Sequence, residues 1–144
     1  MIEARLHAGD IANARFEADS VLASALCAAD SNIRALAWEV KSRVARAERD
    51  LDSARACLDS ALAIIDKVDI PVAAWQVHRT AWDLYTDEGN RVKAGEHRQR
   101  AHELIMRIAD SFAYDEPLRQ SLLTAPPVGR VLERTEGLAR SFGL

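Results

Sequence analysis

Hydrophobic residues recur at spacings of three and four along most of the chain. One stripe follows the candidate N-cap Ser31, and a second follows the candidate N-cap Asp50: Ile33, Leu36, Ala37, Val40 and Val44, then Leu51, Ala54, Leu58, Ala61, Leu62 and Ile65. This spacing places each set on one face of an α-helix. Pro71 suits the first turn of another helix. No segment alternates apolar and polar residues, so the pattern predicts an all-α fold with helices over 11–28, 33–48, 51–67, 71–88 and 91–109.

A repeat with a period of 40 residues runs through these helices. The segments GDIANARFEADSVLA at 9–23, RDLDSARACLDSALA at 49–63 and GNRVKAGEHRQRAHE at 89–103 align with three recurring columns: Ala14, Ala54 and Ala94; Val21, Ala61 and Ala101; and Gly9, Arg49 and Gly89 at the turn. Small residues at fixed helix positions let neighbouring backbones approach closely. A fixed period of this length indicates stacked units, each made of a helix, a tight turn and a second helix.

The third unit, WDLYTDEGNRVKAGEHRQRAHEL, resembles the tetratricopeptide repeat, whose motif positions match Trp82, Tyr85, Gly89, Ala94 and Ala101. The period exceeds the usual length of that repeat, roughly 34 residues. It is similar to the longer-helix variant found in large bacterial signalling ATPases, cyclases and transcriptional activators. Arg49 departs from the motif, which usually has glycine there. Over residues 9–132 the resemblance implies a right-handed superhelix of antiparallel helix pairs. It also implies a non-catalytic, cytoplasmic interaction or regulatory scaffold at the C-terminal end of a larger protein.

The chain divides into repeats over residues 1–110 and C-terminal capping helices over 111–144. Shifting the repeat back by one period leaves only residues 2–8 for the first helix of unit one, so we expect a truncated first unit in a fragment of a longer chain. Its uncovered apolar face is a possible homodimer surface.

In the tail, Asp115 can cap a short helix that Pro126 and Pro127 end. A further helix follows, with the apolar positions Val128, Val131, Leu132, Leu138 and Phe142. Its balanced Arg and Glu content favours capping over membrane binding.

Charge and cysteine content exclude several classes of protein. A net charge of −3 lacks the basic excess of nucleic-acid surfaces. Uncharged stretches of about ten residues are too short to cross a bilayer, and charged residues interrupt the start where a secretory signal would lie. Cys27 and Cys57 are isolated in the sequence, which predicts free, buried thiols in a reducing cytoplasm.

Trp75, His78 and Trp82 share one helix face, and two interpretations are open. They could form a stacking pocket, in which case the chain is a stand-alone helical enzyme or a small-molecule-binding domain. They could instead form the core of a repeat. The core is favoured because burying a Trp contributes at most roughly 4–6 kcal/mol.

His97 and His102 do not share a face and no other ligands are near, so no metal is expected. No nucleophile motif or cofactor loop is present, and we expect neither catalysis nor a cofactor.

The first helix of each unit lines the concave surface of such arrays. With Trp38, Val44, Trp82 and Leu84 facing inward, the polar residues on that surface are Glu39, Arg43, Arg46, Gln76, Arg79 and Asp83. Equivalent positions differ in sign, since Arg43 corresponds to Asp83 and Glu39 to Arg79. The sequence therefore predicts a groove of mixed charge that binds a protein, a peptide or another domain of the parent chain.

Overall fold

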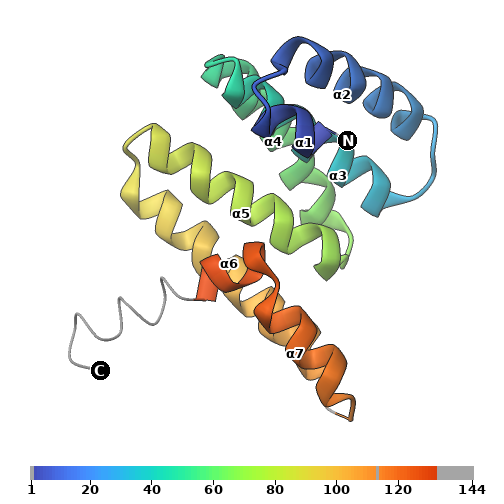
Figure 1. Ribbon diagram of the computed structural model, residues 1–144, viewed down its shortest axis with the longest axis vertical. Coiled ribbons are helices and arrows are strands. Elements are labelled where there is room, and N and C mark those ends of the chain that lie inside the picture. The colour runs from blue at the N-terminus through green and yellow to red at the C-terminus, as the bar shows by residue number, and fades with distance from the viewer. Residues whose placement is uncertain (1, 113, 133–144) are drawn as a thin grey trace.

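The computed structural model describes residues 2–112 and 114–132, and this part of the chain is helical without any strand. The helices, labelled in Figure 1, are α1 (Ile2–His7), α2 (Ile11–Leu26), α3 (Ser31–Ala47), α4 (Leu51–Lys67), α5 (Pro71–Asp87), α6 (Arg91–Asp110) and α7 (Glu116–Thr124). A further helical stretch begins at residue 126 and is described to residue 132. The all-α fold and the five long helices predicted from the sequence are thus confirmed, to within two residues at most ends.

Caps explain where the helices begin. The side chain of Asp50 accepts a hydrogen bond from the Ser53 N–H, and Asp115 accepts one from the Leu118 N–H, as expected. Pro71 occupies the first turn of α5. The prediction for α3 was wrong: Asp30, not Ser31, is the N-cap, and its carboxylate accepts from two backbone N–H groups. Both residue types suit this position, but the carboxylate starts the helix one residue earlier.

Three turns in the structure repeat the same backbone geometry every 40 residues. The second residue after each first helix has a left-handed conformation, with φ of 77° at Gly9, 62° at Arg49 and 77° at Gly89. The next N–H donates to a carbonyl five residues back in each case: Asp10 to Arg5 at 2.8 Å, Asp50 to Ala45 at 3.0 Å and Asn90 to Tyr85 at 2.9 Å. This is the Schellman arrangement, which satisfies carbonyls at the end of the first helix. Residue 49 therefore makes the same turn as its two glycine equivalents.

The alanine columns pack as expected, with one exception. Ala14 and Ala54 are fully buried and Ala94 is 5% exposed, so the second helices approach their neighbours closely. Ala61 and Ala101 are also fully buried, whereas Val21 in the same column is 44% exposed. The difference follows from the stacking, because α4 packs against two long helices, α3 and α5, whereas α1, one of the two neighbours of α2, has only six residues.

The largest core cluster joins α3–α6 with residues 126–132. Trp75, Trp82 and Leu84 of α5 lie in it together with Val128 and Val131, which are 2% and 0% exposed. The core therefore continues past residue 110. The two valines were predicted as apolar positions of a capping helix, and both are buried; Leu138 and Phe142 lie outside the described residues. Pro126 ends α7 as expected, but it also begins this next helical stretch.

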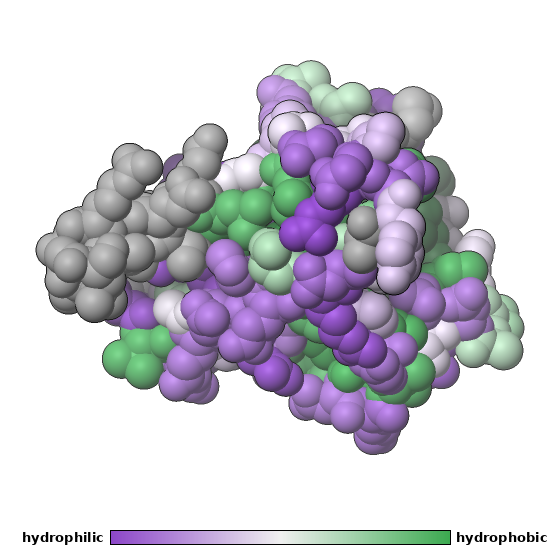
Figure 2. All heavy atoms as spheres, turned by 90° about the horizontal axis from the view of Figure 1, so that it is seen from below, coloured by the Kyte–Doolittle hydropathy of each residue, from purple (hydrophilic) through white to green (hydrophobic). Residues whose placement is uncertain are grey.

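The molecular surface is mostly polar, with smaller apolar areas between the charged side chains on the face shown in Figure 2. Within the described ranges, no helix combines the length and the apolar character that crossing a bilayer requires. Cys57 is buried, but the prediction for Cys27 was wrong: this residue is the C-cap of α2 and its side chain is exposed.

We predict opposite effects of two glycine substitutions. Gly89→Ala should destabilise the fold by about 1 kcal/mol, because an L-residue resists the left-handed conformation. Nothing lies within 4 Å of the Cβ it would add, so the effect reports the backbone alone. Gly95→Ala, inside α6 and equally uncrowded, should stabilise by roughly 0.5–1 kcal/mol. Urea unfolding of both variants checks the pair, and equal effects would contradict the role assigned to the turn.

Candidate binding face

The first helices of successive units, α1, α3 and α5, lie side by side in that order (Figure 1). Ion pairs connect them across the units. Glu3 of α1 accepts from Arg43 of α3 at 2.7 Å, and Arg46 of α3 forms a two-pronged pair with Asp87 of α5. Asp83 of α5 in turn pairs with Arg130 of the stretch after α7. Arg43, Arg46 and Asp83, all predicted for partner binding, are thus already held by charges of the chain itself.

Glu39 was expected on the accessible surface, and the structure buries it completely. Its Oε1 accepts a hydrogen bond of 2.6 Å from the Thr80 hydroxyl of α5, and the carboxylate also pairs with Arg43 at 2.7 Å. Burial lowers the pKa of the Arg43 guanidinium, but the Glu39 and Glu3 carboxylates outweigh that effect and the net shift is upward. Glu39 therefore joins α3 to α5 and does not touch a partner in this arrangement.

Gln76 and Arg79 are the predicted residues that no ion pair in the described chain engages. Both are partly exposed on α5. The Arg79 guanidinium lies 5.5 Å from the centre of the Trp75 ring, within cation–π range. Burial lowers the pKa of Arg79, with Glu39 opposing that shift from a distance. These two side chains are the part of the predicted set most available to a partner.

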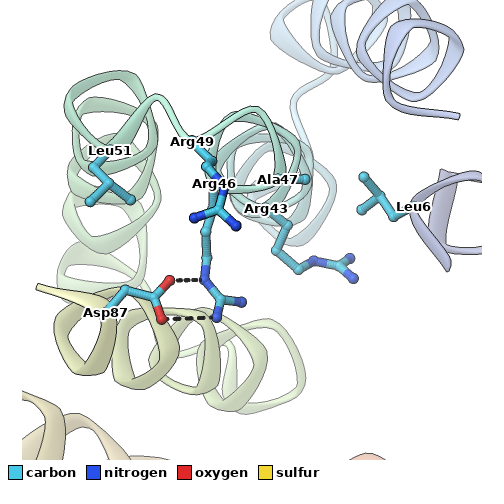
Figure 3. Close-up of a pocket in the computed structure, with 7 residues that line it drawn as sticks. All are labelled: Leu6, Arg43, Arg46, Ala47, Arg49, Leu51 and Asp87. Atoms are coloured by element: carbon cyan, nitrogen blue, oxygen red, sulfur yellow. Dashed lines mark hydrogen bonds and ion pairs between the residues drawn. The ribbon is translucent and has the colours of Figure 1, made fainter. Parts of the chain in front are cut away.

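An open pocket of about 660 Å³ lies where α1, α3 and α5 end. Its lining combines three arginines, one carboxylate and three aliphatic side chains: Leu6, Arg43, Arg46, Ala47, Arg49, Leu51 and Asp87. Figure 3 shows the arginines extending from the end of α3 and its turn, with Leu6 on one side and Leu51 and Asp87 on the other. Sequence reasoning included only Arg43 and Arg46. Among the other lining residues, Arg49 alone stood out in the sequence, because it replaces the glycine that the motif usually has at this turn.

The Trp75, His78 and Trp82 side chains are 9%, 8% and 3% exposed. They are core residues, as the favoured interpretation expected. Arg98 and Arg130 lie over the Trp82 ring, at 5.6 Å and 4.8 Å from its centre. Using these rings as a stacking pocket for a ligand would require them to leave packed neighbours.

His78 is paired with His97 of α6, whose ring also stacks on Tyr85. The two Nδ1 atoms are 2.9 Å apart, so one ring donates the single shared proton and the other accepts it. Burial lowers the pKa of His78 to about 4, with the charges of His97 and Arg100 adding to the shift. Burial also lowers the pKa of His97, against the opposing effect of Glu96. The pair therefore stays neutral at neutral pH.

No cluster of three or more His, Cys, Asp or Glu side chains in residues 2–112 and 114–132 has a geometry that could hold a metal ion. No family model, curated protein or solved structure matches the chain.

We predict that Glu39→Ala destabilises the fold by about 3 kcal/mol, because it leaves the largely buried Arg43 without its buried counter-charge. Glu3→Ala is the matched control, since Glu3 is the other carboxylate partner of Arg43. The Glu3 side chain is 65% exposed. An exposed pair is worth about 1 kcal/mol or less. Urea unfolding compares the two variants. Equal losses of unfolding free energy in the two variants would show that the burial of Glu39 does not determine how much it stabilises the fold.

We predict that the protein loses stability as the pH falls from about 6.5 toward 4. The unfolded His78 gains a proton near pH 6.5 and the folded residue only near pH 4, so the unfolded state binds more protons in that window. The loss should be on the order of 3 kcal/mol at the acid end. His78→Phe should flatten this slope, whereas His7→Gln, an exposed histidine, should leave it unchanged. Unfolding free energies measured between about pH 5.5 and 7, where carboxylates of ordinary pKa stay ionised, test the expectation.

Proposed function

We propose that the chain is a non-catalytic interaction or regulatory scaffold that binds a protein or peptide on the face formed by α1, α3 and α5. In this proposal the helix pairs continue as a right-handed, tetratricopeptide-like superhelix with that face on its inner side. The supporting observation is the turn geometry that recurs every 40 residues, together with the adjacency of the first helices. Stacked helical repeats use such extended surfaces for recognition.

The charge arrangement supports a macromolecular partner. Ion pairs across the units fix Arg43 and Arg46, and a pair with Arg130 fixes Asp83, so the face presents ordered charge and the entropic cost of binding is lower. Gln76 and Arg79 remain available between them. The alternative of a small-molecule site at Trp75, His78 and Trp82 is less well supported, because all three side chains are buried in the core.

On the strength of the sequence resemblance, we propose that this scaffold is the regulatory end of a larger bacterial signalling or transcription-regulating protein in the cytoplasm. Reading the coding sequence upstream of residue 1 tests this part. An ATPase, cyclase, kinase or DNA-binding domain followed by further 40-residue units would support it. A start signal at codon 1 would leave a free-standing adaptor instead.

We predict that the double variant Gln76→Glu with Arg79→Gln lowers retention of the partner by at least roughly tenfold. The glutamine keeps part of the Arg79 stem that covers Trp75, which limits the loss of packing. The wild-type chain and the variant would be immobilised, and bound proteins from extracts of the source cell quantified by mass spectrometry.

The matched control carries Gln99→Glu and Arg100→Gln, the same pair of changes on exposed positions of α6. A specific partner should be retained by the wild type and this control but not by the α5 variant. Equal retention on all three chains, or equal loss on both variants, would contradict the assignment of the binding face.

A further inference from the structure

Arg49 differs from every other arginine lining the pocket at the ends of α1, α3 and α5. Arg43 and Arg46 each have carboxylate partners, whereas no carboxylate in residues 2–112 and 114–132 pairs with Arg49. Its side chain is exposed and belongs to the pocket lining. Its backbone has a φ of 62°, in the region that favours glycine. The chain thus places an unpaired guanidinium at the pocket where the other two units have glycine.

Helix electrostatics account for part of this arginine cluster but not for Arg49. A basic side chain near a helix C-terminus interacts favourably with the macrodipole, and this explains Arg46 in the last turn of α3. The same benefit is available to any basic residue within that turn. It does not require an arginine at the left-handed position after the helix, where glycine makes the turn without strain. Neither the turn nor the helix dipole therefore explains why residue 49 is an arginine, and we look for its role in binding.

The composition of the pocket indicates what would bind beside Arg49. Glu3, Glu39 and Asp87 balance the charges of Arg43 and Arg46, so the charge of Arg49 is the one in the lining that no carboxylate in residues 2–112 and 114–132 offsets. Leu6, Ala47 and Leu51 supply aliphatic walls. A ligand that suits both features has an anionic head and a short hydrocarbon stem.

We propose that this pocket binds an aspartate or glutamate side chain of an acidic protein segment, with Arg49 as its principal recognition residue. The planar guanidinium matches a carboxylate in a two-pronged geometry, and the stem of the acidic residue packs against Leu6 and Leu51. This inference rests on the proposed function, because it assigns the chemistry of one subsite on the same face.

A carboxylate fits the pocket better than a phosphate. Asp87 remains in the wall as the partner of Arg46, and it repels a doubly charged phosphate more strongly than a singly charged carboxylate. The aliphatic walls also suit the hydrocarbon stem of an amino-acid side chain better than a group with three hydrated oxygens. The partner segment should therefore carry acidic residues next to aliphatic ones.

Titration with short peptides tests the proposal. An acetylated, amidated peptide of alternating leucine and glutamate would be added to isotopically labelled wild-type chain, with the side-chain Nε–H signals of Arg43, Arg46 and Arg49 followed by NMR. We expect a saturable shift of the Arg49 signal and weaker binding as salt is raised. The same peptide with glutamine in place of glutamate should bind at least roughly tenfold more weakly.

Arg49→Gly separates recognition from stability. Because glycine suits the left-handed turn, this variant should unfold at the same or a higher temperature than the wild type, yet bind the glutamate peptide at least roughly tenfold more weakly. Arg91→Ala, which removes an exposed arginine just after the equivalent turn of the next unit, should leave peptide binding unchanged.

Three results would overturn the proposal: equal binding by wild type and Arg49→Gly, equal binding of glutamate and glutamine peptides, or no shift at millimolar peptide. Tighter binding of a phosphoserine peptide would overturn the carboxylate assignment. The extract experiment separates this failure from that of the proposed function. If Arg49→Gly retains a partner that the Gln76 and Arg79 double variant loses, the face binds its partner without an acidic subsite in this pocket.

Discussion

The left-handed residue at the end of each first helix is the constraint on which the rest of the structure depends. It reverses the chain within three residues and lets the next N–H close a hydrogen bond onto the preceding helix, as Asp50 does onto Ala45. Asp50 and Asn90 then also cap the helix that follows. One short segment therefore ends a helix, sets the direction of return and begins its partner. With the turn fixed, Ala54 and Ala94 fall where the paired helices approach most closely.

Stacking of one unit on the next depends on a second kind of interaction. Glu39 brings a charge into the interior between α3 and α5, where desolvation disfavours it. The Arg43 guanidinium of the same helix and the Thr80 hydroxyl of α5 satisfy the carboxylate, and the Thr80 contact requires α5 to place residue 80 opposite residue 39. Apolar packing alone tolerates sliding of one helix along another. We interpret the buried charge as a device that fixes the register between units, supported at their ends by the pair of Arg46 with Asp87.

The features that local chemistry decides could be predicted from the sequence. Helix periodicity, the cap at Asp50, Pro71 at the start of α5 and the alanine columns each depend on residues within one or two turns of each other. Burial of Glu39 could not be predicted in this way, because it depends on Thr80, a residue 41 positions along the chain. The sequence comparison aligned Glu39 with Arg79, which suggested that both occupy equivalent surface positions. The pocket was missed for the same reason: its seven lining residues come from four helices and a turn.

Arg49 shows how a departure from a repeat can be interpreted once the structure is known. An arginine where the other repeats have glycine could mean that the motif is lost in this unit. Loss of the motif would predict a different backbone conformation at the turn. The turn at Arg49 keeps a left-handed φ, 62° against 77° at the two glycines, and the same hydrogen bonds, so the fold tolerates the strain instead of changing the turn. Strain of about 1–2 kcal/mol at a residue whose side chain forms no ion pair within residues 2–112 and 114–132 weakens the fold unless that side chain acts elsewhere. The open pocket beside it gives that side chain a place to act, and a stabilised variant that binds less would separate the two roles.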